Sequence, residues 1–151
     1  MAQDAASTVR AERGTRMLHA MVRVRDLDCS LAFYIDRLGM RLLRRQDFPD
    51  GKFTLAFVGY DDEAQSTAIE LTHNWGEHTY ELGTAFGHIA IGVTDVVETV
   101  RLLASEGVRV VRPAGPLKGD PRELIAFVED PDGYRIELIQ RPLVVRTSAQ
   151  A

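Results

Sequence analysis

Two histidines and two glutamates recur at matching places in a sequence that repeats itself. Each histidine opens a short apolar stretch that ends in an aspartate seven residues later, and each glutamate stands between an isoleucine and a leucine. A repeat that only preserved packing would need its apolar positions alone, whereas imidazole and carboxylate groups are ligands that many divalent transition ions accept. We therefore predict a metal site built from the four repeated residues His19, Glu70, His88 and Glu137.

The structural interpretation of these residues has to be weighed against the metal site. A single histidine in a strand is more often a hydrogen-bonded structural residue, and a single strand glutamate usually faces solvent. The matched pairing in both copies favours the metal site. His73 and His78 have no counterpart in the repeat, so we expect them to be surface or loop residues.

The elements that must position these residues follow the same order in both copies. The pattern of each copy predicts a strand, a helix and three further strands. The whole chain is therefore expected to have an α+β fold of two tandem βαβββ modules, over residues 18–73 and 87–140 approximately. In the first copy, strands are expected over 18–24, 42–46, 53–60 and 68–73, with a helix that Asp26 or Asp28 caps and Gly39 ends. In the second copy, strands are expected over 88–93, 108–112, 124–129 and 134–140. A helix is expected from Asp95 to Gly107, with Glu98 as the capping-box partner of Asp95. A loop is expected over 113–122 and a turn over 130–133. The two modules form one domain over residues 17–141, with a disordered extension before it (1–16) and a tail after it (142–151).

Alternation along the strands predicts where the four side chains point. His19 shares a face with Met21 and Arg23, opposite Val22 and Val24, which can pack under a helix. Each glutamate likewise lies opposite its flanking isoleucine and leucine. All four side chains are therefore expected on an open, concave sheet face, away from the helices, where a pocket could form.

The composition excludes several other classes of protein. The net charge is −4 with scattered basic residues, so a nucleic-acid partner is not expected, and no apolar run is long enough to span a membrane. Cys29 is the only cysteine, which excludes an intrachain disulfide and a thiolate-bound zinc cluster. A cytoplasmic location fits this cysteine usage.

Several motifs together resemble the lactoylglutathione lyase (glyoxalase I) family of the vicinal oxygen chelate superfamily. They are Leu18-His19-Ala20-Met21-Val22-Arg23-Val24, Phe33-Tyr34 to Leu38-Gly39-Met40, Leu55-Ala56-Phe57-Val58-Gly59-Tyr60, Ile69-Glu70-Leu71-Thr72-His73-Asn74-Trp75-Gly76, Tyr80-Glu81-Leu82-Gly83, Gly87-His88-Ile89-Ala90 and Phe127-Val128-Glu129-Asp130-Pro131-Asp132-Gly133-Tyr134. The resemblance implies that the four repeated residues are the metal ligands and that Arg23 and Asn74 bind glutathione. It also implies a homodimer in which each site takes His19 and Glu70 from one subunit and His88 and Glu137 from the other.

The resemblance further implies the chemistry. The expected substrate is the hemithioacetal of methylglyoxal and glutathione, and the product is S-D-lactoylglutathione, formed through an enediolate. The short bacterial form resembles the Ni²⁺- or Co²⁺-activated class, although the ligand set also accommodates Zn²⁺. A ligand glutamate is the natural base because no free histidine remains among the four repeated residues; family likeness favours Glu137, with Glu70 as its counterpart. The segment 118–123 is longer and more charged than expected in the bacterial enzymes, at the place of a lid over the thiol.

Three alternative functions compete with this hypothesis. An epimerase of the same superfamily would use related metal chemistry, and an extradiol dioxygenase would use iron with two histidines and one carboxylate, which the fourth ligand argues against. A metal-free protein that sequesters a small molecule has no reason to keep all four repeated residues.

Overall fold

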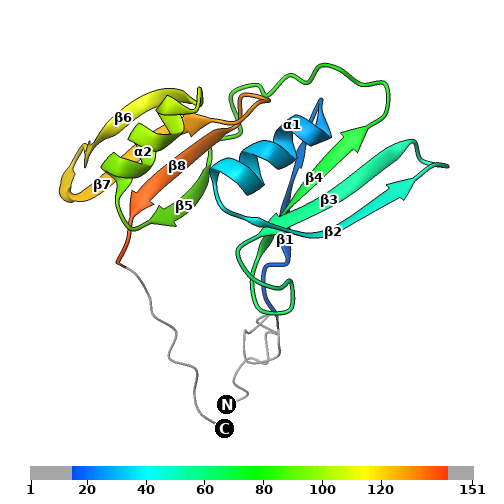
Figure 1. Cartoon of the computed structure of the whole chain (residues 1–151), viewed down its shortest axis with the longest axis horizontal. Coiled ribbons are helices and arrows are strands. Elements are labelled where there is room, and N and C mark those ends of the chain that lie inside the picture. The colour runs from blue at the N-terminus through cyan, green and yellow to red at the C-terminus, as the bar shows by residue number, and fades with distance from the viewer. Residues whose placement is uncertain (1–14, 143–151) are drawn as a thin grey trace, which may run out of the picture.

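The computed structural model describes residues 15–142 and shows two four-stranded sheets side by side (Figure 1). The predicted extension before residue 17 and tail after residue 141 fall almost entirely outside these residues. The first sheet has the order β1-β4-β3-β2 and the second the order β5-β8-β7-β6. Each sheet is one βαβββ module, so the predicted fold class and its tandem arrangement are confirmed.

The first module contains four strands and one helical segment, in which Asp26 rather than Asp28 is the cap. Its elements are β1 (His19–Arg23), α1 (Leu27–Leu31), the π-helical turns η2 (Ala32–Arg37), β2 (Arg41–Phe48), β3 (Phe53–Gly59) and β4 (Ala68–Asn74). The Asp26 carboxylate accepts a hydrogen bond from the Cys29 amide, and Gly39 follows the helical segment with a φ of 72°. The prediction of one regular helix was incomplete, because the Leu38 amide donates to the Phe33 carbonyl five residues back, which widens the last turns.

The second module repeats this order with a regular helix. Its elements are β5 (Ile89–Val93), α2 (Val96–Ser105), β6 (Arg109–Leu117), β7 (Asp120–Glu129) and β8 (Arg135–Gln140). Asp95 caps α2 by accepting from the Glu98 amide. The capping box is only half formed, since the Glu98 carboxylate binds Arg101 within the helix instead of reaching back to the cap.

The prediction of a loop over residues 113–122 was wrong. Strands β6 and β7 continue through this segment as a hairpin, with Leu117 paired to Asp120 across the turn Lys118-Gly119. Pro113 and Pro116 suggested a loop because proline lacks the N–H that a strand uses, but β6 is an edge strand and has a side that needs no partner. The charged segment after residue 117 is therefore a hairpin end rather than an irregular loop.

One hydrophobic core contains residues of both modules. Apolar side chains from β1, β4 and β8 are almost fully buried in it, together with residues of both helices, among them Val22, Leu71, Val96, Ile136 and Leu138. Because the apolar side chains of the strands point into this core, the alternate side chains of the same strands face the other way. Within residues 15–142, no helix is both long and apolar enough to cross a membrane.

Candidate metal half-sites

Each module brings one histidine and one glutamate together on adjacent parallel strands. In the first module, His19 Nε2 lies 3.0 Å from Glu70 Oε2, and in the second His88 Nε2 lies 2.9 Å from Glu137 Oε2. We call these the first pair and the second pair. Both glutamates are offset from their histidines by the same two positions, because Glu70 is in register with Met21 and Glu137 with Ala90. The sequence repeat is therefore also a geometric repeat.

The predicted faces are confirmed by burial. Val22 and Val24 are buried in the core while His19 and Met21 are exposed on the opposite face of β1. The residues that flank Glu70 and Glu137 in their strands are likewise buried, and the glutamates are only partly so. The imidazoles are about two-fifths exposed, at 37% for His19 and 42% for His88, so both pairs are open to a ligand that approaches from outside.

A phenylalanine supports each histidine, which the sequence analysis did not recognise. Phe57 is in register with Glu70, and its ring meets the His19 ring edge-on with 5.4 Å between centroids. Phe127 is in register with Glu137 and meets His88 in the same way, also at 5.4 Å. The repeated Ala-Phe-Val motif was the available signal, but cross-strand register is needed to connect it with the histidines. The apolar ring restricts where each imidazole can turn.

One difference between the surroundings of the two pairs is a hydroxyl group beside the glutamate. The Thr72 Oγ1 donates a hydrogen bond of 3.0 Å to Glu70 Oε1, the carboxylate oxygen that does not face His19. The corresponding position two residues after Glu137 is Ile139, which has no hydroxyl group. The first glutamate is therefore held at both oxygens, whereas the second is held at one among the residues that the structure describes.

Arg23 and Asn74 lie at the far ends of β1 and β4, beyond the first pair. Arg23 is about 13 Å along the strand from His19 at roughly 3.3 Å per residue. The backbone carbonyl of Arg23 accepts a hydrogen bond of 2.9 Å from the Tyr134 hydroxyl, and the Asn74 amide donates to the Tyr80 hydroxyl at 3.2 Å. Arg23 and both tyrosines border one cavity of about 260 Å³. The two predicted substrate residues thus line or adjoin one hollow, and their positions are fixed by tyrosines.

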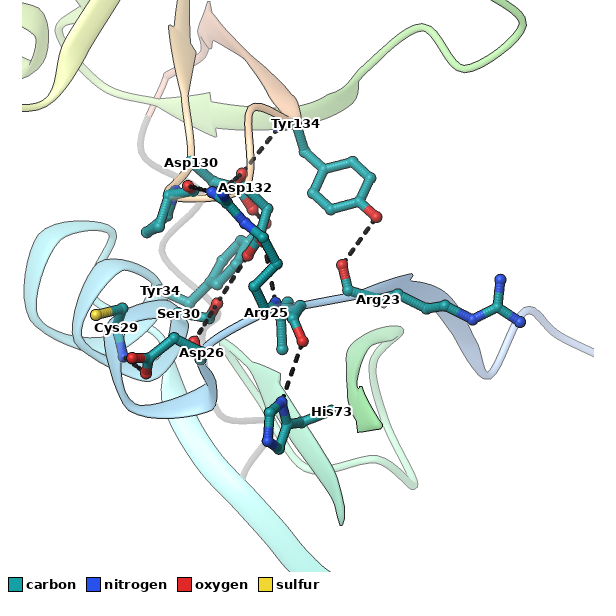
Figure 2. Close-up of polar contacts among 12 residues, drawn as sticks. Arg23, Arg25, Asp26, Cys29, Ser30, Tyr34, His73, Asp130, Asp132 and Tyr134 are labelled. Atoms are coloured by element: carbon teal, nitrogen blue, oxygen red, sulfur yellow. Dashed lines mark hydrogen bonds and ion pairs between the residues drawn. The ribbon is translucent and has the colours of Figure 1, made fainter. Parts of the chain in front are cut away.

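The turn Asp130-Pro131-Asp132-Gly133 joins the two modules close to Arg23 (Figure 2). Asp132 accepts hydrogen bonds from the backbone and side chain of Arg25, and the buried Asp130 accepts one of 2.9 Å from Tyr34. Burial raises the pKa of Asp130 to about 6, although backbone and Tyr34 hydrogen bonds partly oppose this shift. Figure 2 also shows the Arg23 guanidinium pointing away from this network.

The two pairs do not meet within one chain. Among residues 15–142, no group of three or more metal-ligating side chains comes together. Each pair offers one imidazole nitrogen and carboxylate oxygens that converge on the same spot, which suits a divalent ion of borderline softness. Two protein ligands are fewer than the three or four that such ions usually take from a protein. Each pair alone is therefore too small for such a site, and the convergence of all four residues stays a prediction.

Comparison with known proteins identifies the family. Residues 16–138 match the model of the glyoxalase/bleomycin resistance protein/dioxygenase superfamily. The chain is 59% identical to a probable lactoylglutathione lyase of Synechocystis over 82% of this chain and 94% of that one. It is 57% identical to the lactoylglutathione lyase of Neisseria meningitidis over 83% and 91% of the two chains. The chain belongs to the glyoxalase I family.

Solved structures of glyoxalase I enzymes share this fold. Glyoxalase I from Zea mays superposes with a TM-score of 0.82 at 47% identity, over 85% of this chain; the chain spans 46% of the length of the maize protein. The trypanothione-dependent glyoxalase I of Leishmania major superposes with a TM-score of 0.76 at 48% identity, over 83% of this chain and 86% of that one.

Proposed function

We propose that this glyoxalase I family member isomerises the hemithioacetal of methylglyoxal and glutathione to S-D-lactoylglutathione, with a divalent metal and as a homodimer. The observation that carries the proposal is the presence of two equivalent half-sites on one chain, each with a histidine and a glutamate at the same register. The lyase relatives favour this activity over the epimerase, dioxygenase and sequestration alternatives.

Two half-sites on one chain support the homodimer. In a two-fold symmetric dimer every contact occurs twice: if surface A of one subunit meets surface B of its partner, surface B of the first subunit also meets surface A of the partner. If the first pair of one subunit faces the second pair of the other, two identical four-ligand sites form at once. Ligand distances of about 2.0–2.2 Å would be expected at each. An experimental dimer structure in which the pairs lie far apart would contradict this arrangement.

The residues of the chain have distinct roles in the proposed reaction. A divalent ion held by the two pairs would polarise the substrate oxygens and stabilise the negative charge that develops on them. Arg23 and Asn74 bind the carboxylate and backbone of the thiol, which places the reacting carbons near the pairs. Because both histidines are ligands, a glutamate exchanges the proton, and we assign this step to Glu137 with Glu70 as its counterpart.

The proton balance needs no further reactant. The C–H bond next to sulfur breaks and its proton passes to the glutamate carboxylate, and a C–H bond then forms at the neighbouring carbon. The hydroxyl group on the carbon bonded to sulfur loses its proton, and the former ketone oxygen gains one. The carbon bonded to sulfur thereby becomes the thioester carbonyl. A positioned general base typically contributes about 10²- to 10⁴-fold in rate.

We also propose which metal ion and which thiol the protein uses. The two-histidine, two-carboxylate set fits Ni²⁺ or Co²⁺, and Zn²⁺ is accommodated as well. We propose glutathione as the thiol because the expected glutathione ligands Arg23 and Asn74 share one region of the structure. A family member with 48% identity depends on trypanothione, so membership alone leaves the thiol open.

The test is reconstitution of the metal-free protein. Ni²⁺, Co²⁺ or Zn²⁺ is added with methylglyoxal and glutathione, and the thioester is followed by its absorbance. We expect metal-dependent formation of the thioester, fastest with Ni²⁺ or Co²⁺. Trypanothione in place of glutathione distinguishes the thiols. No thioester with any metal and either thiol would refute the proposal.

A further inference from the structure

The two glutamates are equivalent by repeat, strand and register, yet their surroundings are unequal. Burial does not separate them, since the side chain of Glu70 is 14% exposed and that of Glu137 is 13% exposed. The difference is the hydrogen bond that Thr72 donates to Glu70 and that Ile139 cannot donate to Glu137. Thr72 itself is 8% exposed, so its hydroxyl competes little with water for this contact.

Thr72 fixes the orientation of the Glu70 carboxylate. Glu70 Oε1 accepts from Thr72 while Glu70 Oε2 faces His19, so a rotation about the last bond of the side chain would break both contacts. The β-branched threonine side chain is stiff about its first bond, and its position in β4 is set by pairing with both β1 and β3. The hydroxyl is therefore itself firmly placed.

Glu137 lacks this restraint. Its Oε2 faces His88, but position 139, which shares its side of β8, carries an apolar side chain. The structure gives Glu137 an electrostatic interaction with Arg141, whose guanidinium is bound to the Glu123 carboxylate. Among the described residues, rotation of the Glu137 carboxylate thus breaks one short polar contact, with His88, whereas rotation of the Glu70 carboxylate breaks two, with His19 and Thr72.

We propose that Thr72 is a positioning residue that makes the two half-sites functionally different. It keeps Glu70 in place as the permanent ligand, and the absence of a hydroxyl group at position 139 leaves Glu137 as the carboxylate that can turn away from the metal to exchange the proton. This inference rests on the proposed function and adds a physical reason for the division of roles between the glutamates.

The first experiment measures metal affinity without substrate. Ni²⁺ is distributed between the full-length protein and a chromogenic chelator for the wild type, Thr72→Val and Thr72→Ser. Valine keeps the shape of the side chain and removes only the hydroxyl, and partners of this kind typically contribute about 10- to 100-fold to metal affinity. We expect Thr72→Val to bind Ni²⁺ about 10-fold more weakly and Thr72→Ser to recover most of the loss. Equal affinity of wild type and Thr72→Val would overturn the inference.

The second experiment adds the hydroxyl to the other half-site. Ile139→Thr offers Glu137 the contact that Glu70 has, and Ile139→Val is its matched control because valine has the same shape without the hydroxyl. At full Ni²⁺ occupancy we expect kcat of Ile139→Thr to be about 10-fold below that of Ile139→Val, as for one general-base interaction partly lost. Ni²⁺ affinity should be equal or tighter. Equal kcat for the two variants would refute the assigned freedom of Glu137.

The design separates this inference from its rivals. Because Thr72 is also in register with Arg23, the rival role is an effect on substrate binding. In that case Thr72→Val would raise KM and leave Ni²⁺ affinity unchanged, which overturns the inference. A wild-type protein that binds no divalent ion would instead overturn the proposed function itself. Unfolding curves of all four variants verify that each one folds.

Discussion

The proposed sharing of sites between subunits makes a quantitative prediction for mixed dimers. The perturbation is an equimolar mixture of His19→Ala and His88→Ala subunits, allowed to exchange. Each variant alone has a damaged half in both of its sites. In a hybrid dimer, one site combines both damaged halves, while the other combines the intact second pair of one subunit with the intact first pair of its partner. One of the two sites in every hybrid is therefore complete.

The expected recovery follows from this geometry. Random exchange makes about half of all dimers hybrids, and each hybrid has one working site in two, so activity should return to about 25% of the wild-type value for a two-fold symmetric dimer. The assay is the rate of thioester formation per subunit at saturating metal and substrate, before and after exchange. Hybrid formation is verified with subunits that carry different affinity tags.

A second mixture is the control. His19→Ala and Glu70→Ala damage the same half-site, so their hybrids contain no complete site and should stay inactive. The two mixtures have the same amount of exchange and differ only in which half-sites are damaged. Sites built within single chains would leave both mixtures inactive. Confirmed hybrids of His19→Ala and His88→Ala without recovery would therefore refute the shared site.

Three further predictions concern the substrate end, the base and the buried acid. Arg23→Ala should raise KM for the glutathione hemithioacetal with little change in metal content, as loss of uniform binding does; an unchanged KM would make Arg23 a plain surface residue. Glu137→Gln should lose far more kcat than Glu70→Gln at full Ni²⁺ occupancy, and near-normal turnover of a fully metallated Glu137→Gln would make Glu70 the leading base. The pKa of Asp130 is raised from 3.8 to about 6, so the folded state prefers its neutral form, and stability should fall by about 3 kcal/mol as the pH rises from about 4 to above 6. Urea unfolding at several pH values should show that Asp130→Asn lacks this loss, and parallel pH profiles for the two proteins would contradict it.

The local parts of the fold could be predicted from the sequence. Alternation in the strands placed His19 and Glu70 on one face, because a side-chain period of two depends only on the strand itself. The turn after residue 129 and the end of the second helix at Gly107 were predicted from residues that favour those conformations. Proline gave the wrong result in the hairpin after residue 112, because its effect depends on whether a strand is at the edge of a sheet.

Contacts between distant segments could not be predicted in this way. The edge-on contacts of Phe57 with His19 and of Phe127 with His88 depend on strand register, which no local pattern contains. The bond between Tyr34 and Asp130 joins residues of different modules. The Thr72 contact was easier to anticipate, because side chains two residues apart in a strand share a face, which places Thr72 beside Glu70.

The hydrogen bonds between the two modules matter for the proposed shared site, because that site requires the modules to be held in a fixed arrangement. In the proposed dimer each subunit contributes its first pair to one site and its second pair to the other, so both sites can form together only if the two modules keep a fixed relation. Tyr34 and Arg25 of the first module bind Asp130 and Asp132 of the second, and Tyr134 of the second holds the carbonyl of Arg23 in the first (Figure 2). The same turn that couples the modules therefore anchors the strand end that carries the proposed thiol ligand. Changes in this turn should affect thiol binding and the completeness of the metal site together, whereas Arg23→Ala should affect thiol binding alone.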